Sequence, residues 1–152
     1  MDYITEYDRI IQDVTTALKK PIGREIYKIV DRGVPHKPGS LKPGNMGIYT
    51  FIFQDTFLKI GIVGPSSNAR FLSHHYNPRS APSTLAGSLL SDPDMAEYGL
   101  TEENIGEWIK QNCRRIDIFI DAGISIFARD VIEKAFHYRF EPKYEGFKTQ
   151  RK

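Results

Sequence analysis

Arg70, His74 and His75 place a cation and two imidazoles on the helix expected to follow a glycine turn at residues 61–64. Arg70 and His74 are four residues apart, so they share one helix face, whereas His75 lies off that face. The planar fork of an arginine matches phosphate oxygens better than an ammonium group does. The turn itself could cradle a phosphate with backbone N–H groups. However, its sequence, GIVGPSS, has neither a P-loop nor a complete dinucleotide signature, so a nucleotide site is only weakly supported.

Glu133 is a second candidate, because it falls in the middle of an expected helix with Arg129 four residues before it and His137 four residues after it. The alternative for this spacing is a solvated surface ion pair. Other chemistries lack their signatures: no His-x-x-x-His pair suggests zinc, and no Gly-x-Ser-x-Gly motif suggests a serine hydrolase. Cys113, the single cysteine, lies in an acidic segment, which disfavours an activated thiolate.

Two apolar segments are expected to form the hairpin that positions these groups. Residues 46–54 have apolar side chains in both alternating sets, which predicts a central strand covered on both faces. Residues 57–63 predict the returning strand, after a turn at residues 54–56. The hairpin therefore leads directly into the glycine turn and the helix with Arg70.

The register of this hairpin decides which side chains meet. Symmetric pairing about Asp55 places Tyr49 opposite Gly61 and Phe51 opposite Lys59. Tyr49 and Lys59 would then share one face of the sheet, a relation that a slip of one residue would break.

Apolar spacing and capping residues predict the remaining helices at residues 2–19, 67–76, 83–90, 101–112 and 126–140. The last of these places Phe127, Val131, Ala135 and Tyr138 along one face. Residues 115–121, RIDIFID, alternate cleanly and predict a half-buried third strand. Residues 22–30 fit either a short strand or a helix.

Residues 31–45 contain three prolines and three glycines, which predicts a long irregular connection. Lys37 and Lys42 in this connection could contact a nucleic-acid backbone, although solvated lysines are the more common outcome. The expected single domain then comprises an N-terminal helix and connection at 1–45, a core at 46–146 with a helical insert at 83–113, and a basic tail at 147–152.

The 152 residues carry a net charge of +2, but the charge is unevenly distributed. Residues 91–113 have a net charge of −5, so the rest of the chain is basic, as suits a polyanionic ligand on one face. Two differently charged solvated surfaces are an equal alternative. One cysteine, no signal peptide and no apolar run of about 20 residues predict a cytoplasmic protein without membrane contact.

Taken together, several motifs occur in a characteristic order. They are Gly47-Ile48-Tyr49, Lys59-Ile60-Gly61, Arg70, His74, Glu133 and the segment Glu141-Pro142-Lys143-Tyr144. This ordered set resembles the GIY-YIG nuclease superfamily over residues 46–146. The resemblance implies an α/β fold of the α+β type, with a small three-stranded, mainly antiparallel sheet flanked by helices.

The resemblance also implies hydrolysis of phosphodiester bonds in DNA, with RNA as an alternative substrate and a divalent metal ion, Mg²⁺ or Mn²⁺, as cofactor. Tyr49 would activate the attacking water or relay its proton, and Arg70 would clamp the scissile phosphate. Glu133 would hold the metal, and His74 would assist water activation or phosphate positioning. With Lys37, Lys42 and Arg70, the neighbouring His75 is expected to contact nucleic acid.

Two positions depart from the family pattern. Lys59 replaces the second tyrosine, and on the face of Tyr49 its charge would lower the pKa of the phenol. Glu145 occupies a position that is often asparagine, so it is not assigned to the site. Two further alternatives to a nuclease remain open: a non-catalytic nucleic-acid-binding module, and a regulatory protein that binds a partner through residues 2–19. The sequence does not indicate an oligomeric state.

Overall fold

The hairpin at the centre of the fold is joined by a two-residue turn. The computed structural model describes residues 1–81 and 84–145, so Ser83 and the expected tail at 147–152 lie outside the described residues. Strand β2 spans Asn45–Phe53 and strand β3 spans Thr56–Val63. The turn residues between them, Gln54 and Asp55, have φ angles of 47° and 63°, the left-handed values that match the twist of paired strands.

The observed register agrees with symmetric pairing. Tyr49 pairs with Gly61 and Phe51 pairs with Lys59. The register then shifts, so that Ile52 faces Phe57. This irregularity lies beyond Lys59, toward the turn, and leaves the shared face of Tyr49 and Lys59 intact.

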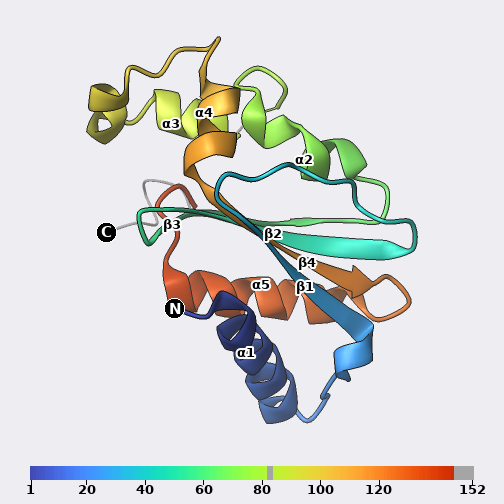
Figure 1. The fold of residues 1–152 in the computed structure, drawn as a ribbon. Coiled ribbons are helices and arrows are strands. Elements are labelled where there is room, and N and C mark those ends of the chain that lie inside the picture. The colour runs from blue at the N-terminus through green and yellow to red at the C-terminus, as the bar shows by residue number, and fades with distance from the viewer. Residues whose placement is uncertain (82–83, 146–152) are drawn as a thin grey trace.

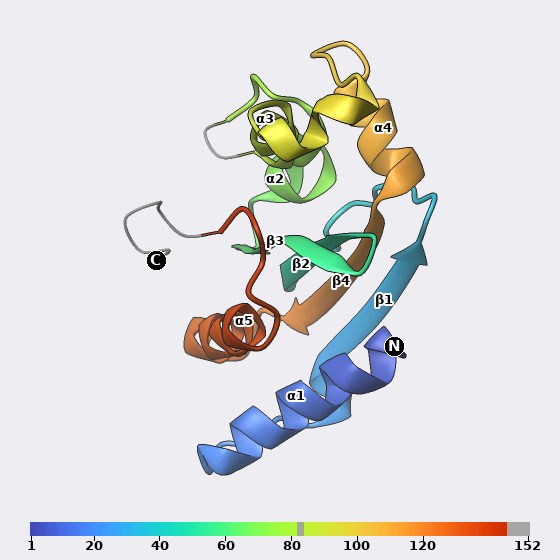
Figure 2. The ribbon, with the colours of Figure 1, turned by 90° about the vertical axis from the view of Figure 1, so that its left-hand side faces the viewer.

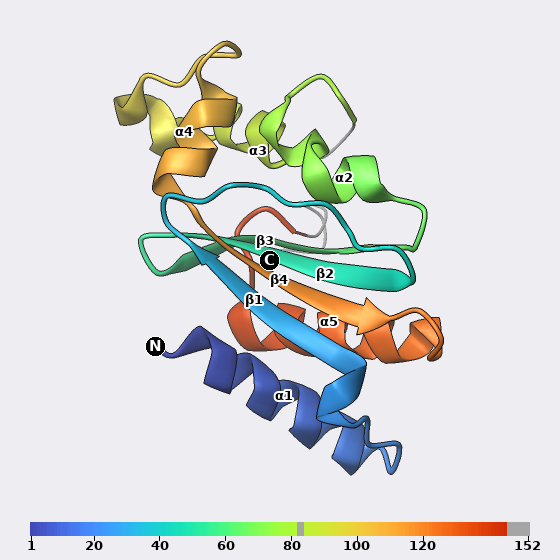
Figure 3. The ribbon, with the colours of Figure 1, turned by 45° about the vertical axis from the view of Figure 1, so that its right-hand side comes forward.

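The sheet has four strands in the order β1-β4-β2-β3, and all neighbouring pairs are antiparallel. The expectation of three strands was wrong because β1, Tyr27–Gly33, forms an additional edge beside β4, Arg114–Asp121 (Figure 3). Lys28, Asp31 and Arg32 interrupt the apolar alternation of β1, so the sequence left a strand and a helix as alternatives for residues 22–30. An edge strand needs fewer apolar residues than a central one because it is partly solvated.

Strand β4 was expected to be half-buried, but it is an inner strand covered on both faces. Its isoleucines contact one helical layer, and the other face carries Arg115 and Asp117, which are 1% and 0% exposed. These two charges are buried because they pair with each other, with Arg115 Nε 2.8 Å from Asp117 Oδ1. The polar residues of the alternating pattern therefore do not mark a solvent face.

One helical layer contains α1, Tyr3–Ala17, and α5, Ile126–Phe140 (Figures 1 and 2). Asp2 caps the N-terminus of α1. The apolar face of α1 packs on the sheet together with α5. Helix α5 buries Ile132, Glu133 and Phe136. Of the apolar residues expected along one face, Val131 and Ala135 pack against the core, whereas Phe127 and Tyr138 are 75% and 87% exposed. No helix among the described residues has the length and apolar character needed to cross a bilayer.

The opposite face of the sheet is covered by the segment between β3 and β4 (Figure 1). Its elements are α2, Asn68–Leu72; η2, His74–Tyr76; α3, Leu85–Leu90; η3, Pro93–Tyr98; and α4, Ile105–Asn112. A further short 3₁₀ turn, η1, Arg24–Ile26, precedes β1. The acidic segment at 91–113 thus lies within the layer that also contains Arg70. The protein is a mixed α+β fold with two helical layers around an antiparallel sheet.

Candidate active site

Tyr49 lies at the centre of the candidate site, on β2 and fully buried. Its ring extends across the neighbouring strand, where Gly61 leaves room for it. A Cβ atom added at Gly61 would lie 2.2 Å from the hydroxyl oxygen of Tyr49. The pairing of a tyrosine with a glycine therefore has a steric cause in this chain, because any side chain at Gly61 would displace the phenol.

The Tyr49 hydroxyl has no hydrogen-bond partner of acceptable geometry among the described residues. Burial raises the pKa of Tyr49 to about 12, and the nearby charge of Arg70 opposes this effect without reversing it. Glu145 raises the same pKa further. The lowering of this pKa expected from the charge of Lys59 therefore does not outweigh burial, and the phenol keeps its proton at neutral pH.

Arg70 lies on the short helix α2 and faces Tyr49. The pKa of Arg70 is raised by Tyr49 first, and then by the carboxylates Glu145 and Glu133. Within the described ranges no carboxylate lies within 4.0 Å of its guanidinium, so Arg70 is not engaged in an ion pair. This cation therefore stands beside a buried phenol with its fork available to an anionic ligand.

Lys59 lies on the same face of the hairpin as Tyr49 and is 3% exposed. Its ammonium nitrogen is 3.1 Å from Oε1 of Glu145. A buried ammonium needs such a partner, because an unpaired charge in the interior is costly. The structure thus supplies a counterion for Lys59.

Glu145 was left out of the expected site, but the chain after α5 brings it there. Backbone N–H groups of Lys143 and Tyr144 donate to the carbonyl oxygens of Phe57 and Leu58, each at 2.9 Å. This short pairing along the edge of β3 places Glu145 beside Lys59. Its position three residues after Pro142 was the only signal in the sequence, and the departure from asparagine had weakened that signal.

Glu133 lies on α5, which packs on the other face of the sheet from α2 (Figure 2). The side chain is largely buried, with Oε2 3.3 Å from Nζ of Lys134 and Oε1 3.5 Å from Nε2 of His137. His137 donates its Nε2–H to the carbonyl oxygen of Ile60 at 2.9 Å, which fixes the imidazole at β3. Glu133 thus contacts His137, as the spacing suggested, but the carboxylate is buried rather than solvated.

Whether Glu133 could hold a divalent cation depends on the other ligand atoms near it. In residues 1–81 and 84–145, no three His, Cys, Asp or Glu side chains form a metal-binding group. Mg²⁺ does not require one, since it commonly retains several waters and uses one or two carboxylates plus phosphate oxygens. Glu133 also raises the pKa of Arg70, so the carboxylate and the phosphate-binding candidate interact electrostatically. A single-carboxylate Mg²⁺ site fits these residues.

The two histidines are arranged differently from the expected helix. Helix α2 ends at Leu72, and His74 belongs to the separate turn η2, so Arg70 and His74 do not lie on one continuous helix face. His75, rather than His74, is buried against Tyr49, with ring centroids 4.6 Å apart. The break after Leu72 turns the chain, and this rotation brings the second imidazole inward.

Lys37 and Lys42 are exposed on the connection after β1. Lys42 lies 6.0 Å from the ring centroid of Phe119, and no described contact links either lysine to Tyr49 or Arg70. They are not part of the group assembled around Tyr49, and their expected contact with nucleic acid stays a prediction.

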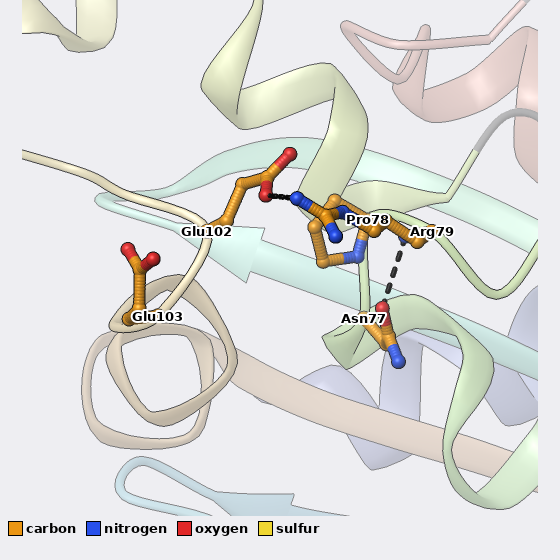
Figure 4. A pocket seen from close by; sticks show the side chains of 5 residues that line it. All are labelled: Asn77, Pro78, Arg79, Glu102 and Glu103. Carbon is orange, nitrogen blue, oxygen red and sulfur yellow. Dashed lines mark hydrogen bonds and ion pairs between the residues drawn. The ribbon is translucent and has the colours of Figure 1, made fainter.

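A second polar pocket lies at Asn77, Pro78, Arg79, Glu102 and Glu103 (Figure 4). Arg79 forms an ion pair with Glu102, and its backbone N–H donates to Asn77 Oδ1 at 2.9 Å. Both charged side chains of the ion pair are largely exposed, so water competes for them. This pocket offers no desolvated reactive group, whereas the surroundings of Tyr49 do.

Comparisons with known proteins bear on the family resemblance. No protein-family model, curated protein or solved structure matches this chain. The resemblance to GIY-YIG nucleases therefore rests on the residues and the geometry described above.

Proposed function

We propose that this protein is a GIY-YIG-like, metal-dependent endonuclease that hydrolyses phosphodiester bonds in DNA. The observation that supports this most is the environment of the Tyr49 hydroxyl, which is buried, lacks a described partner and faces the guanidinium of Arg70. Lys59 lies on the same face of the hairpin as Tyr49, and Glu133, from α5, interacts electrostatically with Arg70. A phenol, two cations and a carboxylate around one edge strand form a site suited to an anionic ester.

Arg70 would bind the non-bridging oxygens of the scissile phosphate. Charge builds on these oxygens during hydrolysis, and a fixed guanidinium stabilises it more in a partly buried site than in water. Glu133 would hold the divalent cation, which when bound supplies charge stabilisation on the leaving-group side. These two residues approach the phosphate from different helices, α2 and α5, and the sheet keeps their separation fixed.

Tyr49 would act on the attacking water as a proton relay. Because the pKa of Tyr49 is about 12, the phenol is not a resident base at neutral pH. Its hydroxyl can instead accept the proton of the attacking water while it donates its own proton to a non-bridging oxygen of the bound phosphate. Lys59 would contribute positive charge in this step only when its pairing with Glu145 is loosened, for example by the incoming phosphate.

Supercoiled plasmid incubated with the protein and Mg²⁺ or Mn²⁺ tests the proposal. Nicked circles should accumulate with wild type, and Glu133→Gln and Arg70→Ala should each slow nicking by about 10²-fold or more. We expect both variants to keep the backbone of helices α2 and α5 unchanged. Matched circular-dichroism spectra would show that the variants are folded.

The same samples separate a nuclease from a non-catalytic binding module. Salt-dependent DNA binding without nicking by wild type in either metal would favour the binding module. Nicking by both variants at the wild-type rate would contradict the assignment of the site. An RNA substrate tested in parallel would show whether the cleavage is specific for DNA.

A further inference from the structure

Two buried polar atoms lack a hydrogen-bond partner among the described residues, and the rings that carry them are in contact. They are the hydroxyl oxygen of Tyr49 and Nε2 of His75, and the two rings have centroids 4.6 Å apart. Buried polar groups are normally paired, because an unpaired one costs its full desolvation energy. Two such atoms on contacting rings therefore mark a place that suits a polar atom of a ligand.

The hydrogen bonds of His75 define its tautomer. The backbone N–H of Leu85 donates to Nδ1 at 3.2 Å, and a backbone amide can act only as a donor. Nδ1 must therefore be the unprotonated nitrogen, and in the neutral ring the hydrogen lies on Nε2. The unpartnered atom is thus an N–H donor that requires an acceptor.

The surroundings keep this imidazole neutral. Burial lowers the pKa of His75 to about 2, and the charges of Lys59, Arg70 and Arg115 act in the same direction, as does His74. Tyr49 is the other titratable group in ring contact with it, and this phenol is protonated at neutral pH. His75 is consequently a neutral donor that does not titrate at neutral pH, and the positive charges around it help to keep it neutral.

We propose that His75 is a catalytic residue that donates its Nε2–H to a non-bridging oxygen of the bound phosphodiester, beside the Tyr49 hydroxyl. This inference rests on the proposed function and replaces His74 in the role that the helical spacing had suggested. The cations that disfavour a charged imidazole favour an anionic oxygen in the same place. A neutral donor held in this field contributes to binding of the developing charge without competing for protons.

Two substitutions separate the donor from the rest of the ring. In His75→Asn, the amide oxygen can take the place of Nδ1 and accept from Leu85, but the distal donor is lost. In His75→Gln, the longer side chain returns an N–H group to the place of Nε2. We expect His75→Asn to lower kcat by about 10²-fold, and His75→Gln to stay within about tenfold of wild type. Gln111→Asn, at an exposed position of α4, is the control and should leave kcat unchanged.

Equal loss in His75→Asn and His75→Gln would overturn the proposal, because ring packing rather than the donor would then matter. Wild-type rates in His75→Asn would overturn it as well. Neither result depends on whether the expected metal dependence is correct, which the plasmid assay with Glu133→Gln decides.

Nitrogen NMR of histidine-labelled protein tests the inference without catalysis. We expect His75 to show a protonated Nε2 and an unprotonated Nδ1 that do not change between about pH 5 and pH 8. Added inorganic phosphate should shift the Nε2–H resonance in a saturable manner. A protonated Nδ1, titration in this range, or no response to phosphate would contradict the assignment, even if the protein cleaves DNA.

Discussion

The Tyr49 hydroxyl is retained at a cost in stability, since it is buried without a described partner. Replacing it with phenylalanine removes the unpaired group and keeps the ring. We expect Tyr49→Phe to raise the free energy of unfolding by about 1 kcal/mol while slowing DNA nicking by about 10²-fold. Urea denaturation and the plasmid assay on one preparation measure both effects.

Tyr7 provides the matched control for this prediction. Its hydroxyl is also buried, but it lies 2.7 Å from Oγ1 of Thr50 and is therefore paired. Tyr7→Phe should reduce stability by about 1–2 kcal/mol and leave the rate of nicking unchanged. Similar destabilisation in both tyrosine variants would mean that the Tyr49 hydroxyl has a structural partner after all.

Gly61 is the steric counterpart of Tyr49. Because a Cβ atom there would lie 2.2 Å from the phenolic oxygen, Gly61→Ala should destabilise the fold by about 1–3 kcal/mol and displace the ring. Gly64→Ala is the control, since the nearest atom to its added Cβ is Nη1 of Arg129 at 4.0 Å. Thermal denaturation would contradict this account if the two variants melted together.

At the scale of elements, Arg115 attaches the segment with Arg70 and His75 to the sheet. Its guanidinium donates from Nη2 to the Phe71 carbonyl oxygen at 2.6 Å, and from Nη1 to the Tyr76 hydroxyl at 2.9 Å. Nε pairs with Asp117, so β4, α2 and η2 are joined through one buried side chain. The orientation of the two site residues thus depends on a residue that does not contact the phosphate.

Arg115→Ala should cost about 3–5 kcal/mol, because it leaves Asp117 buried with only Arg32 as its described ion-pair partner. Arg114→Ala is the neighbouring control. Its side chain is 38% exposed and pairs with Asp31 at 3.0 Å, so its loss should cost at most about 1 kcal/mol. Chemical denaturation measures both, and equal losses would refute the structural role given to Arg115.

Element positions followed from the sequence where local rules apply. The turn at Gln54 and Asp55 and the apolar alternation predicted both the hairpin and the pairing of Tyr49 with Gly61. Strand β4 was misjudged because Arg115 and Asp117 were taken as solvent-facing, whereas their mutual pairing permits burial. The pairing of two buried charges depends on how the chain folds in three dimensions, and the periodicity of the sequence carries no information about it.

The site was predictable only in part for the same reason. Tyr49 and Arg70 lie together as the motif order suggested, and their charges influence each other. His75 required knowledge that the helix breaks after Leu72, and Glu145 required knowledge that the chain after α5 pairs with β3. The position of His75 depends on where a short helix ends. The position of Glu145 depends on a contact between segments that are distant along the chain.

At the scale of the whole molecule, buried neutral histidines make stability depend on pH. The pKa of His75 is lowered to about 2, and burial also lowers the pKa of His36. Below the unfolded value of about 6.5, the unfolded chain binds protons that the folded protein does not, so stability falls as pH falls. Each such histidine contributes a slope of up to about 1.4 kcal/mol per pH unit.

Wild type should therefore lose about 2 kcal/mol of stability from His75 alone between about pH 6.5 and pH 5. His75→Gln should remove this share of the loss. Urea titrations at the two pH values measure the difference. A slope unaffected by His75→Gln would show that this imidazole is protonated in the folded protein.

The central claim, that Glu133 and the surroundings of Tyr49 form a metal-dependent nuclease site, is tested most directly by one ratio. This is the rate of plasmid nicking by wild type divided by that of Glu133→Gln, in Mg²⁺, with Glu103→Gln on the exposed acidic segment as the control. We predict a ratio of about 10² or more for Glu133→Gln and about 1 for Glu103→Gln. Equal nicking by wild type and Glu133→Gln, or no nicking by folded wild-type protein, would contradict the account.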